Sequence, residues 1–227
     1  MSIFSYESKF SRIMQHLAES CMLNIMWFIC SIPIFTIGAA TTALYTVTIA
    51  IAENREGDII QQFVRAFKSN FKQATVLWLI LLAIGVFLGT DIYILWHLRT
   101  TTQAALAIFW TILLAILFAA CIVYAIEITF VFPLVARVEN TNRAMLVNSL
   151  LIGTHYLNCF LCVFAIHFAM AFVAIRFFTP ILIFGEGTCA LLSSYLFSPV
   201  IRACTTKPEA NDEEEDEDGN ESEEDEA

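Results

Sequence analysis

The chain has 227 residues, of which 58% are hydrophobic and 20 are Phe. A soluble domain of this size cannot bury so much apolar side chain, and several stretches of 18 or more residues carry no charge, which is typical of transmembrane helices. The composition therefore excludes a soluble globular protein and predicts an all-α, polytopic membrane helix bundle.

The net charge of −10 comes from the C-terminal end of the chain. Thirteen of the 22 acidic residues lie in 209–227, and the rest of the chain carries 9 acidic and 12 basic side chains. A segment this acidic cannot bury apolar surface. We therefore expect residues 1–207 to form the membrane domain and residues 208–227 to form a disordered tail, which anionic lipid repels into the cytoplasm.

Residues 3–17 begin the chain with apolar side chains at helical spacing, which predicts a short helix on the inner membrane surface. The 33 residues from Ser20 to Ala52 then carry no charge. As one straight helix they would measure roughly 50 Å, whereas the hydrocarbon core is about 30 Å thick. The length favours two short spans joined by a turn over one long helix with a proline kink.

Local chemistry in this run also favours a turn. Pro33 lacks an N–H and disfavours helical geometry in the residue before it, so a helix should end there. Thr36 can cap the next helix, and Gly38 adds flexibility. The small residues of 38–43 allow a neighbouring helix to approach closely.

A polar loop and an amphipathic helix follow in residues 53–72. We predict that this helix is interfacial and cytoplasmic, because basic residues lie beside its phenylalanine face. Its characteristic residues are Arg65, Phe67, Lys68, Asn70, Phe71 and Lys72.

Further apolar segments complete a prediction of six spans. The fifth is closed by Arg176, and Thr179 with Pro180 starts the sixth. The approximate spans are residues 16–33, 36–52, 73–96, 104–133, 149–175 and 180–201.

The distribution of basic residues predicts the orientation. With a turn at Pro33, ten of the 12 Lys and Arg residues lie on one side, and only Arg99 and Arg176 lie on the other. Without the turn the split is 8 to 4, because Lys9 and Arg12 change sides. The positive-inside rule therefore favours a multi-pass protein of the cell membrane with both termini in the cytoplasm.

The cysteines and known motifs indicate no catalysis. Six of the seven cysteines lie in apolar runs, and Cys159-x-x-Cys162 lies in a membrane segment without a second pair. His155 and His167 are twelve residues apart on the fifth span, too far to share a metal. We find no nucleophile, phosphate-loop, zinc or dinucleotide motif, and we expect no enzyme activity, cofactor, metal or nucleic-acid partner.

Ionisable residues within spans are candidates for function. For Asp91 and Glu127, simple solvation at a membrane interface explains the charge at least as well as a functional role does. Glu186, between two glycines, lies either in an interrupted helix or in an outer loop. We predict an outward-facing polar pocket formed by Asp91, Arg99, His167, Arg176 and Glu186.

Three stretches of this sequence carry a family resemblance. They are 24-NIMWFICSIPIFTIGAATTALY-45, 63-FVRAFKSNFKQAT-75 and 132-FPLVARVENTNRAMLVNSL-150. The sequence resembles the YesL family of Gram-positive bacterial membrane proteins over roughly residues 5–205. The first stretch has a hairpin motif that includes Asn24, Trp27, Pro33, Thr36, Gly38 and Tyr45, although Ala39 stands where the family usually has proline.

The resemblance implies no catalytic residues, because the molecular function of that family is not established. Its members tend to be encoded near carbohydrate-uptake systems. This implies an accessory or regulatory component that contacts the lipid bilayer and an uptake-system permease. The alternative is a small-solute transporter or channel subunit, which would act as a homo-oligomer because six short spans enclose little space.

Overall fold

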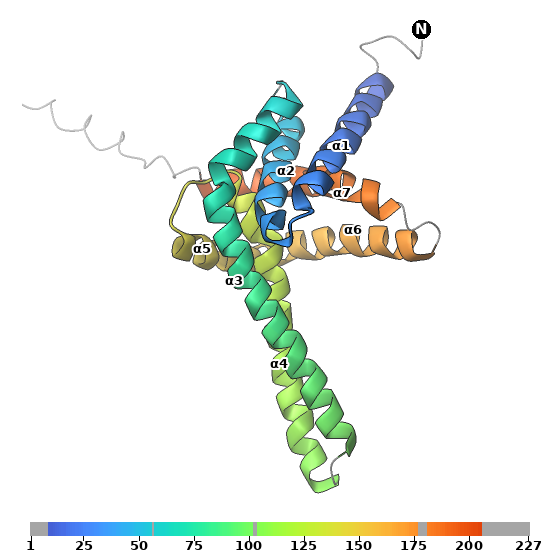
Figure 1. The fold of residues 1–227 in the computed structure, drawn as a ribbon, viewed down its shortest axis with the longest axis vertical. Helices are drawn as coiled ribbons and strands as arrows, with labels where there is room; N and C mark the ends of the chain where they lie inside the picture. The colour runs from blue at the N-terminus through green and yellow to red at the C-terminus, as the bar shows by residue number, and fades with distance from the viewer. Residues whose placement is uncertain (1–8, 56, 102–103, 177–180, 206–227) are drawn as a thin grey trace, which may run out of the picture.

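The computed structural model describes residues 9–55, 57–101, 104–176 and 181–205, and this part of the chain is all-helical (Figure 1). Four segments are long and apolar enough to cross a membrane: Ile34–Ala52, Ile59–Arg99, Ile108–Val135 and Leu157–Arg176. The predicted acidic tail and the Thr179–Pro180 helix start lie outside the described residues. The helices are α1 (Lys9–Ser31), α2 (Ile37–Ala52), α3 (Ile59–Thr101), α4 (Ala104–Val135), α5 (Asn142–His155), α6 (Leu157–Arg176) and α7 (Ile181–Thr205).

The chain turns between α1 and α2, as the length and proline arguments predict. Helix α1 ends at Ser31, Pro33 is extended with φ −75° and ψ 115°, and a 3₁₀ turn at Ile34–Thr36 leads into α2. Helices α1 and α2 lie side by side (Figure 1). A single kinked helix is therefore excluded.

The predicted role of Thr36 as a side-chain cap is wrong. Thr36 occupies the N-cap position of α2, but its side chain accepts no hydrogen bond from the helix. Its hydroxyl instead lies 2.6 Å from the carbonyl oxygens of both Cys30 and Pro33, to which it donates. Cys30 is in the last turn of α1, where carbonyl oxygens lack helical partners, so the Thr36 hydroxyl stabilises the end of α1 rather than the start of α2.

Helix α2 is the centre of the molecule. It packs against α1, α3, α4 and α7, and most of its residues are buried. Of the small residues in 38–43 predicted to permit close helix approach, five are buried and Thr41 is half-buried; the buried residues are Gly38, Ala39, Ala40, Thr42 and Ala43. This confirms that the small-residue stretch brings helices together.

Helix α3 joins two elements that the sequence predicts separately. The segment expected to be an interfacial helix is the first part of this one long helix, which packs beside α2 (Figure 1). Its apolar face is buried only in part, since Phe63 is fully buried whereas Phe71 is exposed. Arg65 and Lys68 are also exposed. The segment is therefore not a separate helix, and its place at the cytoplasmic membrane interface stays a prediction.

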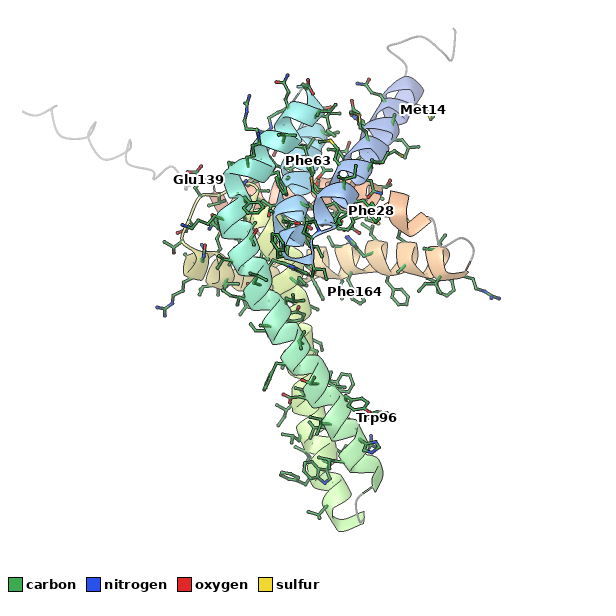
Figure 2. All side chains as sticks on the ribbon, in the orientation of Figure 1. Met14, Phe28, Phe63, Trp96, Glu139 and Phe164 are labelled. Carbon is green, nitrogen blue, oxygen red and sulfur yellow. The ribbon has the colours of Figure 1, made fainter. Side chains whose placement is uncertain are left out.

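The second half of α3 and the first half of α4 form a hairpin that projects from the rest of the molecule (Figure 1). Trp96 lies near the end of this projection (Figure 2). Apolar side chains face outward all around it, among them Tyr93, Ile108 and Ile116. Two helices that are apolar on every side need an apolar surrounding, which a lipid bilayer supplies.

The C-terminal helices differ from the predicted spans. The fifth span, residues 149–175, falls on two helices, because the chain leaves helical geometry at Tyr156 with φ −102° and ψ 50°. Helix α7 continues through Gly185 and Gly187, so Glu186 lies in neither an interrupted helix nor a loop. Helices α6 and α7 run across the direction of the α3–α4 hairpin (Figure 1).

Candidate functional site

The hairpin motif holds the α1–α2 turn against α3. The indole N–H of Trp27 donates to the hydroxyl of Thr41 at 3.1 Å, which links α1 to α2. The indole N–H of Trp78 on α3 donates to the carbonyl oxygen of Ile34 at 2.8 Å. The two tryptophans are thus fixed by polar contacts at either side of the turn.

Gly38 permits the close approach of α2 to α3. A Cβ at this position would lie 2.5 Å from Cβ of Trp78 and 2.6 Å from the carbonyl oxygen of Ala74. Both distances are below normal contact, and one involves backbone that cannot rotate away. Only glycine fits here, so its role is close packing, beyond the flexibility expected from sequence.

Asn24 holds α7 against α1. Its side chain is fully buried, and Oδ1 accepts a hydrogen bond from the backbone N–H of Gly187 at 2.9 Å. A Cβ at Gly187 would lie 2.4 Å from the carbonyl oxygen of Ser20. This contact positions the first part of α7, and with it Glu186.

A cavity of about 310 Å³ lies where these helices meet. The described residues that line it are mostly apolar and include five aromatic side chains. Phe164 lies on α6 near the point where that helix passes the α1–α2 turn (Figure 2). The lining residues are Trp27, Ile37, Thr41, Tyr45, Trp78, Ile128, Thr129, Phe132, Val163, Phe164, His167 and Glu186.

Two ionisable side chains meet in this cavity. His167 Nε2 on α6 lies 3.9 Å from Glu186 Oε1 on α7, and the two side chains keep 33% and 31% of their surface exposed. His167 Nδ1 lies 2.9 Å from the carbonyl oxygen of Val163 one turn earlier. The backbone of α6 thus orients the His167 ring, and the Asn24 contact positions the part of α7 that carries Glu186.

Only part of the predicted polar pocket comes together. His167 and Glu186 form the pair just described. Asp91 and Arg99 lie on the projecting half of α3, and Arg176 is the last residue of α6. These three are not among the residues that line the cavity.

Sequence reasoning missed the aromatic wall of the cavity. Trp27 and Tyr45 were recognised only as parts of the hairpin motif, and Trp78 was not singled out. The sequence contains one signal that could have selected them: each is a Trp or Tyr, whose N–H or O–H group needs a partner within an otherwise apolar span. Thr41 follows Trp27 by 14 residues, a separation that a hairpin at Pro33 converts into contact.

A second charged cluster surrounds Glu53 at the C-terminal end of α2. Its side chain is 2% exposed; Arg137 and Ser198 bind Oε1, and Arg55 binds Oε2. Arg202 Nε also lies 3.2 Å from Oε1. Burial raises the pKa of Glu53, but the Ser198 hydrogen bond and the arginines lower it, so that the pKa lies below its ordinary value of 4.5.

This Glu53 cluster joins parts of the chain that are distant in sequence. Glu53 follows α2, Arg137 lies in the connection between α4 and α5, and Ser198 lies on α7. The carboxylate is therefore a structural clamp at the end of the bundle. The pattern of residues offers no reason to select it, because Arg137 and Ser198, which join it to other helices, are 84 and 145 residues away.

In the part of the chain that the structure describes, neither the cysteines nor the other titratable groups form a metal or disulfide site. All seven cysteines are free. No group of three or more His, Cys, Asp or Glu side chains is arranged to hold a metal ion within residues 9–55, 57–101, 104–176 and 181–205. Glu127, the remaining carboxylate in a span, is buried and accepts a hydrogen bond from Ser149 at 2.7 Å.

Together these features show that the described part of the chain is all-helical, has four helices long and apolar enough to cross a bilayer, and contains an aromatic cavity beside the α1–α2 hairpin. Residues 21–92 match the model of a family described as protein of unknown function, DUF624. That region spans α1 from Cys21 to its end, all of α2 and α3 as far as Ile92, and it includes Trp27, Tyr45 and Trp78. No curated protein and no solved structure matches the chain.

Proposed function

We propose that the protein is a six-span membrane protein that binds a small solute in the cavity, as a transporter or channel subunit and not as an enzyme. The observation that carries this proposal is the placement of the His167–Glu186 pair inside an aromatic cavity of about 310 Å³. Ligand sites are typically about 300–1,000 Å³, largely apolar, and furnished with a few polar groups.

The cost of the pair supports a functional role. Ionisable side chains within spans are expensive, and they commonly mark substrate or ion pathways. A purely structural pair would be expected to pack without free space around it. Here both side chains retain about a third of their surface, and they line the cavity.

The two ends of α2 support an outward-facing cavity. The cavity begins at Ile37, the first residue of α2, whereas the Glu53 cluster gathers three arginines at the other end. The separation along α2 is roughly 24 Å at 1.5 Å per residue. If the arginines lie inside, as the positive-inside rule expects, both termini are cytoplasmic and the cavity lies toward the outer leaflet.

Tryptophan fluorescence provides a direct test. Trp27 and Trp78 line the cavity, whereas Trp96 and Trp110 lie on the α3–α4 hairpin and are not among the lining residues. Purified protein in lipid nanodiscs would be titrated with sugars, amino acids and amines. We expect a saturable fluorescence change that persists in Trp96→Phe and is strongly reduced in Trp78→Phe.

The outcome against the proposal is equally specific. Protein that is monodisperse and folded, but shows no saturable change with any solute class, would overturn solute binding. A change that survives in Trp78→Phe and disappears in Trp96→Phe would place the binding site elsewhere.

A second candidate function is an accessory role in carbohydrate uptake. The DUF624 match over residues 21–92 supports it, because this match is consistent with the YesL-type resemblance. Purification from native membranes should then recover an uptake-system permease. Recovery of the protein without a permease, combined with binding of solutes other than sugars, would leave only the first function.

A further inference from the structure

We infer that the His167–Glu186 pair is an exchange site, at which a small organic cation displaces a proton that the pair holds when the cavity is free of cation. This inference rests on the proposed solute-binding function and names its ligand class. It follows from the tautomer of His167, from the charge of the cavity and from the aromatic wall.

The tautomer of His167 is set by its backbone contact. Nδ1 lies 2.9 Å from the carbonyl oxygen of Val163, and a carbonyl oxygen can only accept a hydrogen bond. Nδ1 must therefore carry a hydrogen. In neutral histidine this leaves Nε2 as a bare acceptor, and Nε2 is the atom that faces Glu186 Oε1.

An unprotonated Nε2 and an ionised carboxylate are both hydrogen-bond acceptors, so neither can donate to the other. The arrangement is favourable only when one proton lies on Nε2, giving an imidazolium beside a carboxylate, or on Oε1, giving two neutral groups. In either form the pair holds one proton and has no net charge. Without that proton the pair has one negative charge in a largely apolar cavity, and this charge needs a cation.

The remaining groups at the cavity supply no such cation. Among the described lining residues there is no Lys or Arg. The titratable neighbours of Glu186 are His167 from α6, Tyr45 from α2 and Cys189 from its own helix. Helix α1 presents the uncharged Asn24 to the adjacent Gly187, and α4 contributes Thr129 and Phe132. A ligand cation is therefore the natural counter-charge.

The wall of the cavity selects an organic cation over a sugar. Aromatic faces attract cations, and Trp78 and Phe132 lie side by side with ring centroids 6.2 Å apart. Most polar groups of the wall already have partners: both indole N–H groups, Thr41, and Thr129, which donates to Ala125. A sugar would find few partners for its hydroxyl groups, whereas an alkylammonium needs one carboxylate.

The exchange balances in atoms and charge. One monovalent cation enters the cavity and pairs with the Glu186 carboxylate. One proton leaves the pair to water, and His167 remains neutral with its hydrogen on Nδ1. The cavity has the same net charge before and after, which keeps the cost of charge in an apolar environment low.

The test compares a permanent cation with its uncharged carbon analogue. The probes are (2-hydroxyethyl)trimethylammonium and 3,3-dimethylbutan-1-ol, which have nearly the same shape and differ in charge. Binding to protein in nanodiscs is followed by tryptophan fluorescence, and proton release is followed with an indicator dye in weakly buffered solution. The cation carries no exchangeable proton on nitrogen, so released protons come from the protein.

We expect the cation to bind at least about tenfold more tightly than the alcohol and to release about one proton when the pair is protonated. In that acidic range, its apparent Kd should rise by about tenfold for each unit that the pH falls. Glu186→Gln should lose both the cation preference and the proton release. Glu186→Asp, which keeps the charge, should retain them in part, and the remote carboxylate variant Asp91→Asn should retain both fully.

Two results would overturn the exchange site while leaving solute binding intact. One is equal binding of the alcohol and the cation. The other is cation binding that is unchanged in Glu186→Gln, provided that this variant and the parent protein unfold at similar temperatures. Absence of binding by every solute class, in contrast, contradicts the proposed function itself.

Discussion

Asn24 on α1 and Gly187 on α7 are joined by a buried hydrogen bond, in which the Asn24 side-chain oxygen accepts the backbone N–H of Gly187 at 2.9 Å. The two residues are 163 positions apart in the chain. The adjacent contact, from the Ser20 hydroxyl to Thr188 Oγ1 at 3.3 Å, lies on the same pair of helices. Helix α1 thereby holds the helix that carries Glu186 in place.

Replacement of Asn24 by Leu should weaken the attachment of α7. Loss of a buried hydrogen-bond partner costs about 1–3 kcal/mol, and the lower part of this range applies because Asn24 Nδ2 has no partner to lose. The measurement is the free energy of unfolding in detergent. Asn70→Leu is the matched control, because within the described residues its side chain bonds to its own helix, at the carbonyl oxygen of Ala66. Equal losses in the two variants would contradict a specific role for Asn24.

Two glycines of the apolar helices should respond in opposite ways to alanine. Gly38→Ala places a methyl group against the backbone of α3 and should lower the unfolding free energy by about 1–3 kcal/mol, because the helices must separate. Gly89→Ala meets nothing within 4 Å and should be neutral or stabilising by up to about 1 kcal/mol. Thermal unfolding of the two proteins in the same detergent measures the difference. A tolerated Gly38→Ala would mean that α2 and α3 are less closely packed than the structure shows.

Acid should weaken the Glu53 cluster. The pKa of Glu53 lies below its ordinary value of 4.5 in the folded protein, so the folded state holds the proton less tightly than the unfolded state. The stability contributed by this group is present above pH 4.5 and is lost as the pH falls through the lower, folded-state pKa. The unfolding temperature should decline over this acidic range.

The matched variants for this prediction are Glu53→Gln and Glu139→Gln. The first should be less stable at neutral pH and should show a smaller decline in acid, because its side chain does not titrate. The second changes an exposed carboxylate in the α4–α5 connection (Figure 2), and its decline should match that of the parent. Identical acid profiles for Glu53→Gln and the parent would show that the cluster does not control acid stability.

The helical class, the membrane character and the turn at Pro33 follow from sequence, because they depend on chain length, charge-free runs and the geometry of proline. The break at Tyr156 does not follow, because Gly153, three residues before it, lies in an apolar run without proline, and a single glycine in such a run does not by itself end a helix. The continuity of α7 through Gly185 and Gly187 was also missed, because their small size serves helix packing there and not interruption.

The candidate site was predictable in part. His167 and Glu186 could be selected because ionisable residues in spans are costly, but nothing in the sequence showed that α6 and α7 bring them within 3.9 Å. Asp91 and Arg99 satisfied the same criterion, and the structure places them on the projecting hairpin. Long-range pairing, such as Trp27 with Thr41 or Glu53 with Arg137, depends on the fold and has no local signature.

Glu127 should be replaceable by an apolar residue. One carboxylate oxygen accepts from Ser149, but Oε2 is buried without a hydrogen-bond partner. Glu127→Met should therefore leave the unfolding free energy unchanged or raise it by up to about 3 kcal/mol. Ser149→Ala should be destabilising in the parent protein and nearly neutral in the Glu127→Met background. An additive loss in this double-mutant cycle would show that the Ser149–Glu127 contact contributes nothing.

The orientation of the first hairpin can be tested by thiol labelling of intact cells. The proposed topology places the α1–α2 turn outside and the first half of α3 inside. Thr36 is a poor probe, because it is only 5% exposed and its hydroxyl is bound to the backbone. Ile34 in the same turn is 64% exposed, and Ser69 on α3 is exposed.

In a background without the seven native cysteines, Ile34→Cys should react with a membrane-impermeant reagent, and Ser69→Cys should react only after the cells are opened. The reverse labelling pattern would mean that the protein has the opposite orientation in the membrane, with the cavity on the cytoplasmic side. Reaction of both cysteines in intact cells would mean that the segment between them does not cross the bilayer.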